Sequence, residues 1–192
     1  MTGAVDRHRQ RCYDAETAAL GGTLVDERWP WADLVALLDR VVAHPWWIGF
    51  GVAPPHLRPG RSDSRRSWSD GTSLVLAPAG CTPLTLAHEL AHHLRRPTAT
   101  EAAHGPTFRA AEVRTVALVG GTTAGALLEA ELHRWRIPPA PWVDPEPPSG
   151  VGLAELVRLE RLRATTRAPT AGPPSERIDG AIPLGSAPPR AG

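Results

Sequence analysis

The residues best suited to chemistry in this chain are histidines clustered in its middle. Four of the eight histidines lie between positions 88 and 104, and His88 and His92 enclose Glu89 in an HExxH pattern. Residues four apart on a helix point the same way, so the two imidazoles can bind one zinc ion. Glu89 lies about 100° around the helix from His88, where its carboxylate can take a proton from a zinc-activated water.

A helix must hold this pattern, and the flanking residues predict one. Thr82 is a suitable N-cap, Pro83 suits the first helical turn, and Pro97 ends the helix after Leu94. On a helical projection with His88 at 0°, the apolar residues fall at about 160–240°, and they are Leu86, Leu90 and Leu94. We therefore expect one face of the helix to bind metal and the opposite face to enter the core.

A catalytic zinc ion takes three protein ligands and leaves one position for water, so a third ligand is needed. His104 is the favoured candidate, because it lies beyond the Pro97 break in the sequence HGPTF. Gly105 permits close backbone approach there, and Phe108 would anchor the next helix to the core. Glu112 and Glu101 are the rivals. Without the upstream pattern, His104 would be read as an exposed loop histidine.

Other segments predict the elements around this helix. Helices are expected over residues 30–42, from 106 to near 120, and from 122 or 123 to 135. Strands are expected at 46–52 and 72–77, with an arginine-containing loop at 53–67 to which we assign no function. The N-terminal segment with Tyr13 and Glu16 reads as a polar leader.

Composition narrows the possible functions. The 192 residues include 21 Lys plus Arg, all of them arginine, so mechanisms that need a lysine amine are excluded. The net charge of +1 gives no electrostatic reason to expect a nucleic-acid partner. Cys12 and Cys81 are read as reduced thiols, and no signal peptide or membrane span is evident. We expect a cytoplasmic protein without membrane contact.

The chain divides by composition into two parts. Residues 1–137 have the pattern of one compact α+β domain, with a small sheet, the HExxH helix and further helices. Residues 138–192 are rich in proline and glycine and are expected to form a flexible tail. A short helix is possible within that tail at 152–163.

The sequences HELAHHL and HGPTF together resemble the SprT-like zinc metallopeptidases over about residues 72–135. The chain is also similar to an actinobacterial family of HExxH metallohydrolases, which shares a leader like CYDAE at residues 12–16. The resemblance implies a zincin-like domain with His88, His92 and His104 as Zn²⁺ ligands and Glu89 as catalytic base. It also implies that residues 72–77 are a sheet edge facing an extended peptide. DNA binding is not carried over, because the chain has no cysteine-rich zinc module and no net-basic surface.

The leading hypothesis is a zinc metallopeptidase that acts on a protein or peptide, with Glu89 as general base. Tyr13, an arginine such as Arg65 or Arg66, or the zinc alone could stabilise the oxyanion, whereas His93 is expected to point away from the metal. Two alternatives remain open: a non-catalytic, zinc-stabilised binding module, and a hydrolase of a non-peptide amide.

Overall fold

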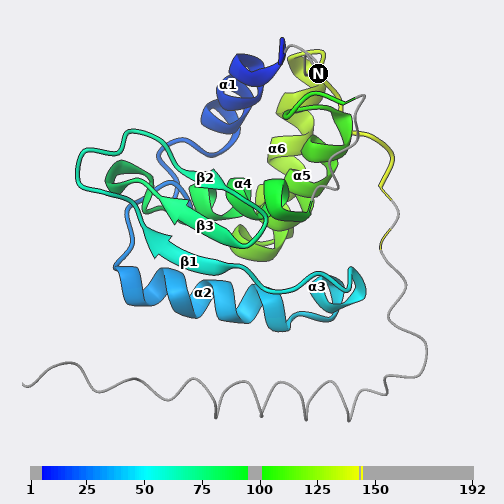
Figure 1. The fold of residues 1–192 in the computed structure, drawn as a ribbon. Helices are drawn as coiled ribbons and strands as arrows, with labels where there is room; N and C mark the ends of the chain where they lie inside the picture. The colour runs from blue at the N-terminus through cyan, green and yellow to red at the C-terminus, as the bar shows by residue number, and fades with distance from the viewer. Residues whose placement is uncertain (1–5, 95–100, 143, 145–192) are drawn as a thin grey trace, which may run out of the picture. The chain divides into compact units, whose positions relative to one another are not determined.

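The computed structural model describes residues 6–94, 101–142 and 144. These residues form a mixed α+β fold, as predicted, with six α-helices, one short 3-10 turn (Pro78–Gly80) and a three-stranded sheet (Figure 1). In chain order the elements are α1 (Arg9–Leu20), α2 (Trp31–Ala43), α3 (Pro45–Gly49), β1 (His56–Pro59), β2 (Trp68–Ser69), β3 (Ser73–Leu76), α4 (Pro83–Leu94), α5 (Pro106–Gly120) and α6 (Thr122–Arg134).

Four predicted helices are confirmed, namely α2, α4, α5 and α6. The predicted start of α4 is also confirmed, because the backbone N–H of Thr85 donates to the Thr82 hydroxyl at 3.1 Å. That bond satisfies one of the N–H groups that have no partner in the first helical turn. Pro83 and Pro106 begin α4 and α5, where the missing N–H of proline costs nothing.

The predicted strand at 46–52 is wrong. Its first residues form α3, a helix of five residues that begins at Pro45. The His44 ring nitrogen Nδ1 accepts a hydrogen bond from the Trp46 backbone N–H at 3.2 Å and caps the helix. Gly51, with φ of 62°, then turns the chain in the left-handed region that glycine tolerates best. The aromatic residues favoured a strand, but the proline and the cap decide the local structure.

The sheet corrects two further expectations. Its order is β1-β3-β2, so β3 at residues 73–76 is the central strand and not an exposed edge. β1 pairs with β3 in parallel, and β2 pairs with it antiparallel. β1 lies inside the segment expected to be a loop, because the prolines of that segment argued against a strand. An edge strand can include Pro59, because an edge position can lack a ladder N–H.

The N-terminal segment is not a polar leader but the helix α1, which packs against α6. Its inner side contributes Cys12, Ala15 and Leu20 to a core cluster shared with α5 and α6. A second cluster joins α2, α3 and β3 to one side of α4. Figure 1 shows α4 between these two groups of elements, so both cores fix its position.

The first residues of the expected tail contact the domain. The Ala140 N–H donates to the Pro106 carbonyl at 2.9 Å, and Trp142 packs against Phe108 and its neighbours. The indole N–H groups of Trp46 and Trp142 both donate to Asp144 Oδ1. Packing therefore continues past Ile137, whereas the predicted helix at 152–163 lies outside the described residues.

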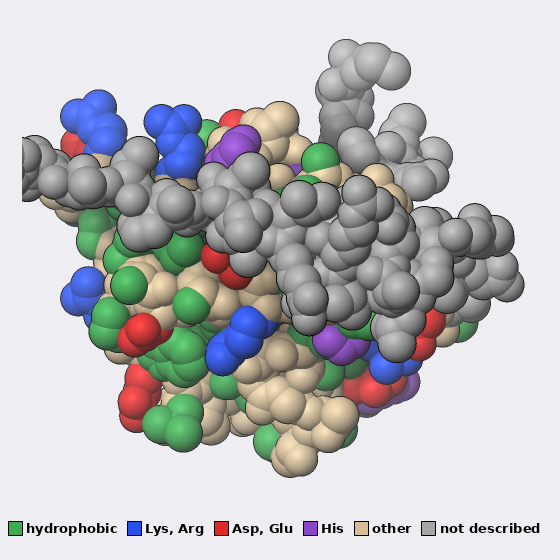
Figure 2. Space-filling view, turned by 90° about the horizontal axis from the view of Figure 1, so that it is seen from below, with side chains coloured by type: hydrophobic (Ala, Val, Ile, Leu, Met, Phe, Trp, Pro, Cys, Tyr) green, Lys and Arg blue, Asp and Glu red, His purple; other side chains and the backbone are tan. Residues whose placement is uncertain are grey.

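Charged side chains are mixed on the surface. On the face seen in Figure 2, acidic and arginine side chains are interspersed with apolar ones where the described residues are visible. None of the helices in the described part of the chain combines the length and apolar character that crossing a membrane requires.

Candidate metal centre

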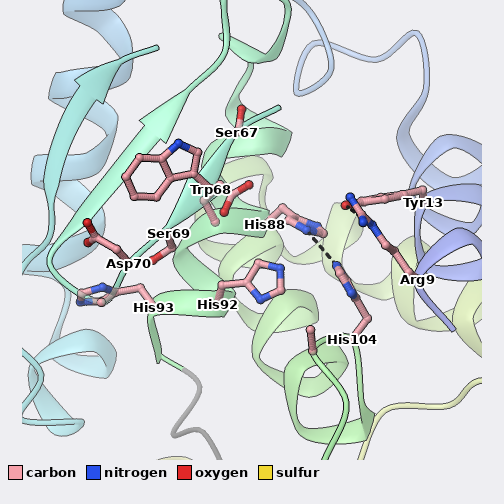
Figure 3. Close-up of a pocket in the computed structure, with 13 residues that line it drawn as sticks. Arg9, Tyr13, Ser67, Trp68, Ser69, Asp70, His88, His92, His93 and His104 are labelled. Carbon is pink, nitrogen blue, oxygen red and sulfur yellow. Dashed lines mark hydrogen bonds between the residues drawn. The ribbon is translucent and has the colours of Figure 1, made fainter. Parts of the chain in front are cut away.

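Helix α4 orients its two faces as the sequence predicts. Leu86, Leu90 and Leu94 are buried in the core cluster formed with α2 and the sheet. His88 and His92 lie on another side, where His104 reaches them from the loop before α5 (Figure 3). One nitrogen from each of these three rings, which we call the histidine triad, lies within 4.8 Å of the others.

The spacing of His88 and His104 within the triad fits a tetrahedral metal ion. The Nε2 atoms of His88 and His104 are 3.4 Å apart. Two imidazole nitrogens bound to zinc at 2.0–2.1 Å with tetrahedral angles are separated by about 3.3–3.4 Å. The donor set is also chemically suitable, because imidazole is a preferred zinc ligand. The residues present therefore fit a zinc ion.

Phe108 forms an apolar floor beneath the triad. Its fully buried ring lies 5.1 Å from the His88 ring, 4.3 Å from the His92 ring and 4.8 Å from the His104 ring, between centroids. It also packs with Ala91 of α4 and Ala111 of α5. A rigid side chain in this position limits the rotation of all three imidazoles, and it excludes water from one side of the site.

Two buried carboxylates hold the outer nitrogen of His88. Oxygen atoms of Glu112 and Glu16 lie 2.8 Å and 3.0 Å from Nδ1. Burial lowers the pKa of His88, but the two carboxylates outweigh it and keep that pKa well above its usual value. Burial and the nearby Glu16 raise the pKa of Glu112 to about 8. A proton on His88 Nδ1 can be donated to these carboxylates, which leaves His88 Nε2 facing the other two rings of the triad.

His104 is held by both its ring and its backbone. Asp6 Oδ2 lies 2.5 Å from His104 Nδ1, which again favours Nε2 as the inward-facing nitrogen. The buried guanidinium of Arg109 donates to the His104 carbonyl and to the Pro138 carbonyl. The Cys12 thiol lies 3.9 Å from the same His104 carbonyl. These contacts fix the position of His104 although it lies in a loop.

We predict that Asp6→Asn weakens zinc binding by about ten- to one-hundred-fold, because the variant loses the charge that orients His104. Competition with a chromophoric zinc chelator measures the affinity. Asp63→Asn, which changes an exposed aspartate paired only with the exposed Arg61, is the matched control. Equal affinities for Asp6→Asn and the unaltered protein would show that Asp6 does not orient the ligand.

The two alternative candidates for the third ligand, Glu112 and Glu101, make other contacts. Glu112 lies on the outer side of His88, where it contacts Nδ1, and it is not part of the triad. Glu101 accepts hydrogen bonds from the backbone N–H and the hydroxyl of Thr107, and it thereby caps the start of α5. Gly105 makes room for this cap, because a Cβ at that position would overlap the Glu101 side chain.

Glu89 borders a cleft of about 560 Å³ that the triad also lines. Its neighbours along the cleft come from α1 and from β2 with the residues on either side of it, and they include Arg9, Tyr13, Ser67, Trp68, Ser69, Asp70 and Gly71. Burial raises the pKa of the Glu89 carboxyl. Among the described residues it has no hydrogen-bond partner. A carboxylate in this setting is available to exchange a proton with a molecule in the cleft.

Of the candidates for stabilising the oxyanion, Tyr13 lies at the cleft and the two arginines do not. Tyr13 lines the cleft, with its ring centroid 5.4 Å from that of His88 and 5.6 Å from that of His104. His93 turns away from the triad, as expected: its Nε2 lies 2.9 Å from the Ala53 carbonyl and its ring stacks on Trp47. The exposed Arg65 and Arg66 are not among the described residues that line the cleft.

Glu16, Asp6 and Arg109 contribute to the site and were not predicted from the sequence to do so. One signal was present for Glu16, because Arg9, Tyr13 and Glu16 are spaced to share one face of a helix. Reading the segment as a leader concealed that spacing. Asp6 carries no comparable local signal, because its partner His104 is 98 residues away in the sequence. Arg109 carries none either, because it binds the backbone carbonyl of His104, and a carbonyl is present at every residue.

Comparison of this chain with protein-family models, with curated proteins and with solved structures found no match.

Proposed function

We propose that this protein is a zinc-dependent metallohydrolase of the HExxH type, and that it cleaves peptide bonds with Glu89 as general base. The observation that carries the proposal is the convergence of His88, His92 and His104 on the wall of a cleft that Glu89 also borders. The resemblance to SprT-like metallopeptidases supports the same reading. A small sheet beside the HExxH helix is compatible with a zincin-like domain.

The residues divide the chemistry among them. The triad would hold the zinc ion, with the outer carboxylates orienting His88 and His104. Bound zinc lowers the pKa of a water ligand to about 7 and polarises a carbonyl group. Glu89 accepts a proton from the attacking water and delivers it to the leaving amine. The raised pKa of Glu89 suits both halves of this exchange, because the group must both take and release the proton.

An extended peptide is the substrate shape that suits the cleft. Within the described sheet, β2 pairs on one side only, with β3, and residues of β2 line the cleft. β2 therefore replaces residues 72–77 as the edge for strand addition, in which backbone hydrogen bonds bind the substrate with limited side-chain selectivity. Trp68 of β2, with 47% of its surface exposed, provides an apolar contact there.

The proposal is tested by metal analysis together with an activity assay. The purified full chain should contain about one zinc per molecule and should cleave a chemically unfolded model protein. A chelator should abolish the cleavage and added zinc should restore it. A folded chain that binds no zinc would overturn the proposal. If zinc binds but peptide bonds stay intact, profiling against non-peptide amides distinguishes the related hydrolase.

A purely structural zinc site fits the geometry less well. Such sites have four protein ligands and no need of a base. In the described residues the triad supplies three, and Glu89, which is not among them, borders the open cleft.

A further inference from the structure

The N-terminal helix α1 presents one face to the histidine triad. Arg9, Tyr13 and Glu16 are spaced four and three residues apart, so they lie on the same side of the helix. Glu16 contacts His88 at the inner end of this row, and Asp6 contacts His104 just before the helix begins. These two contacts at separate points fix the helix relative to the triad. They leave Arg9 and Tyr13 at the cleft between them (Figure 3).

In the hydrogen bond between Arg9 and Tyr13, Arg9 is the donor and the Tyr13 hydroxyl is the acceptor. Arg9 Nε donates to the Tyr13 hydroxyl oxygen over 3.4 Å, and the guanidinium carbon lies 5.5 Å from the centre of the Tyr13 ring. Because the hydroxyl oxygen accepts this bond, its own hydrogen is available to another acceptor. Among the described residues no such acceptor is assigned to it. Among the described residues no carboxylate forms an ion pair with Arg9, although Asp6 acts on its guanidinium electrostatically.

We propose that the Tyr13 hydroxyl, supported by Arg9, donates a hydrogen bond to the negatively charged oxygen that develops on the substrate carbonyl during hydrolysis. This inference rests on the proposed function. When water adds to an amide carbonyl, the carbonyl oxygen gains negative charge, and donors already in place stabilise that charge more than the neutral carbonyl. Tyr13 is a catalytic residue in this scheme, and Arg9 is a positioning residue that also adds positive charge.

Other polar groups around the cleft lie on the β2 side or are bonded elsewhere. Asp70 on the opposite wall is acidic, and it accepts hydrogen bonds from the backbone N–H groups of Thr72 and Ser73. His93 is bonded to the Ala53 carbonyl. The Ser67 hydroxyl accepts a hydrogen bond from the Ala77 backbone N–H, and Ser67 lies beside β2, away from α1. Arg9 and Tyr13 are therefore the cationic and hydroxyl donors on the α1 side of the cleft.

The test uses methylphosphonate, whose tetrahedral anionic oxygens resemble those of the hydrolytic transition state. Its dissociation constant is measured by calorimetry with the zinc-loaded full chain and with Tyr13→Phe and Arg9→Gln. We expect Tyr13→Phe to weaken binding by about ten- to one-hundred-fold, the usual effect of one hydrogen bond to a charged group. Arg9→Gln should weaken it by a similar factor. Arg11→Gln, an exposed arginine on the same helix outside the cleft, is the matched control and should bind as the unaltered protein does.

A spectroscopic measurement reports on the contact directly. Tyr13 is the only tyrosine in the chain, so labelling tyrosine at Cζ with carbon-13 gives one NMR resonance. Methylphosphonate should shift that resonance in the zinc-loaded protein and in Arg11→Gln. In turnover, Tyr13→Phe should lower kcat by about 10²–10³-fold while KM changes little, because the bond strengthens only in the transition state.

The outcomes separate this inference from the proposed function. If the unaltered chain binds zinc and cleaves peptide bonds, but Tyr13→Phe keeps the same methylphosphonate affinity or kcat, the role of Tyr13 is overturned and the proposed function stands. An unmoved Cζ resonance, or failure of the zinc-loaded chain to bind methylphosphonate, overturns the inference in the same way. If the folded chain binds no zinc, both fail together. Equal zinc content and equal circular dichroism spectra confirm that the variants are folded and loaded.

Discussion

Replacing His104 with alanine is expected to lower zinc affinity by more than one-hundred-fold, whereas Glu112→Gln is expected to lower it by about ten- to one-hundred-fold. The difference follows from where each side chain lies. His104 Nε2 is 3.4 Å from His88 Nε2 within the triad, and Glu112 contacts the outer nitrogen of His88. Loss of an outer partner typically costs one to two orders of magnitude in metal affinity, and loss of a ligand removes a coordinate bond. Equilibrium dialysis against buffered zinc measures both variants.

Stability controls keep this comparison interpretable. Both variants should be melted in the presence of a chelator, so that a difference in zinc affinity is not a difference in folding. Glutamine is preferred to alanine at position 112, because Glu112 is fully buried and a truncated side chain would leave a cavity. If Glu112→Gln loses zinc more readily than His104→Ala, the third ligand is Glu112 and the proposed triad is incorrect.

Changing Glu89 to glutamine is expected to reduce kcat by about 10²–10⁴-fold while leaving about one zinc per chain. Glutamine keeps the shape of the side chain but cannot accept the water proton. The triad does not include Glu89, so metal should remain bound. Cleavage of the unfolded model protein and metal analysis of the same sample provide the two measurements.

Glu27→Gln is the matched control for the loss of one carboxylate, because Glu27 is exposed and is not among the residues that line the cleft. Its activity should equal that of the unaltered protein. If Glu89→Gln retains full activity, another group acts as the base. If Glu89→Gln loses zinc, its effect on turnover would no longer measure proton transfer.

Helices with local start signals could be predicted from the sequence. Thr82 and Pro83 specify where α4 begins, and the apolar spacing of Leu86, Leu90 and Leu94 specifies which face is buried. The sheet could not be predicted as well. β1 and β2 have four and two residues, and they exist because β3 lies between them. Such short strands depend on long-range pairing, for which propensity carries little information.

The same distinction holds for the candidate site. The spacing of His88 and His92 is a property of one helix and is visible in the sequence. The roles of Asp6 and Glu16 depend on how α1 docks, with partners 98 and 72 residues away. Strong hydrophobic periodicity was absent there, because the inner face of α1 carries Cys12, Tyr13 and Glu16 together with small apolar residues. The polar residues that indicated a leader are the ones that face the metal centre.

The contacts of Asp6 and Glu16 couple two parts of the molecule thermodynamically. A ligand that binds the three imidazoles more tightly when both carboxylates orient them also binds more tightly when α1 is docked. By mass action, such a ligand lowers the population of molecules in which α1 has locally detached. The resistance of the N-terminal helix to proteases should therefore increase as the ligand occupies a site formed largely by the middle of the chain.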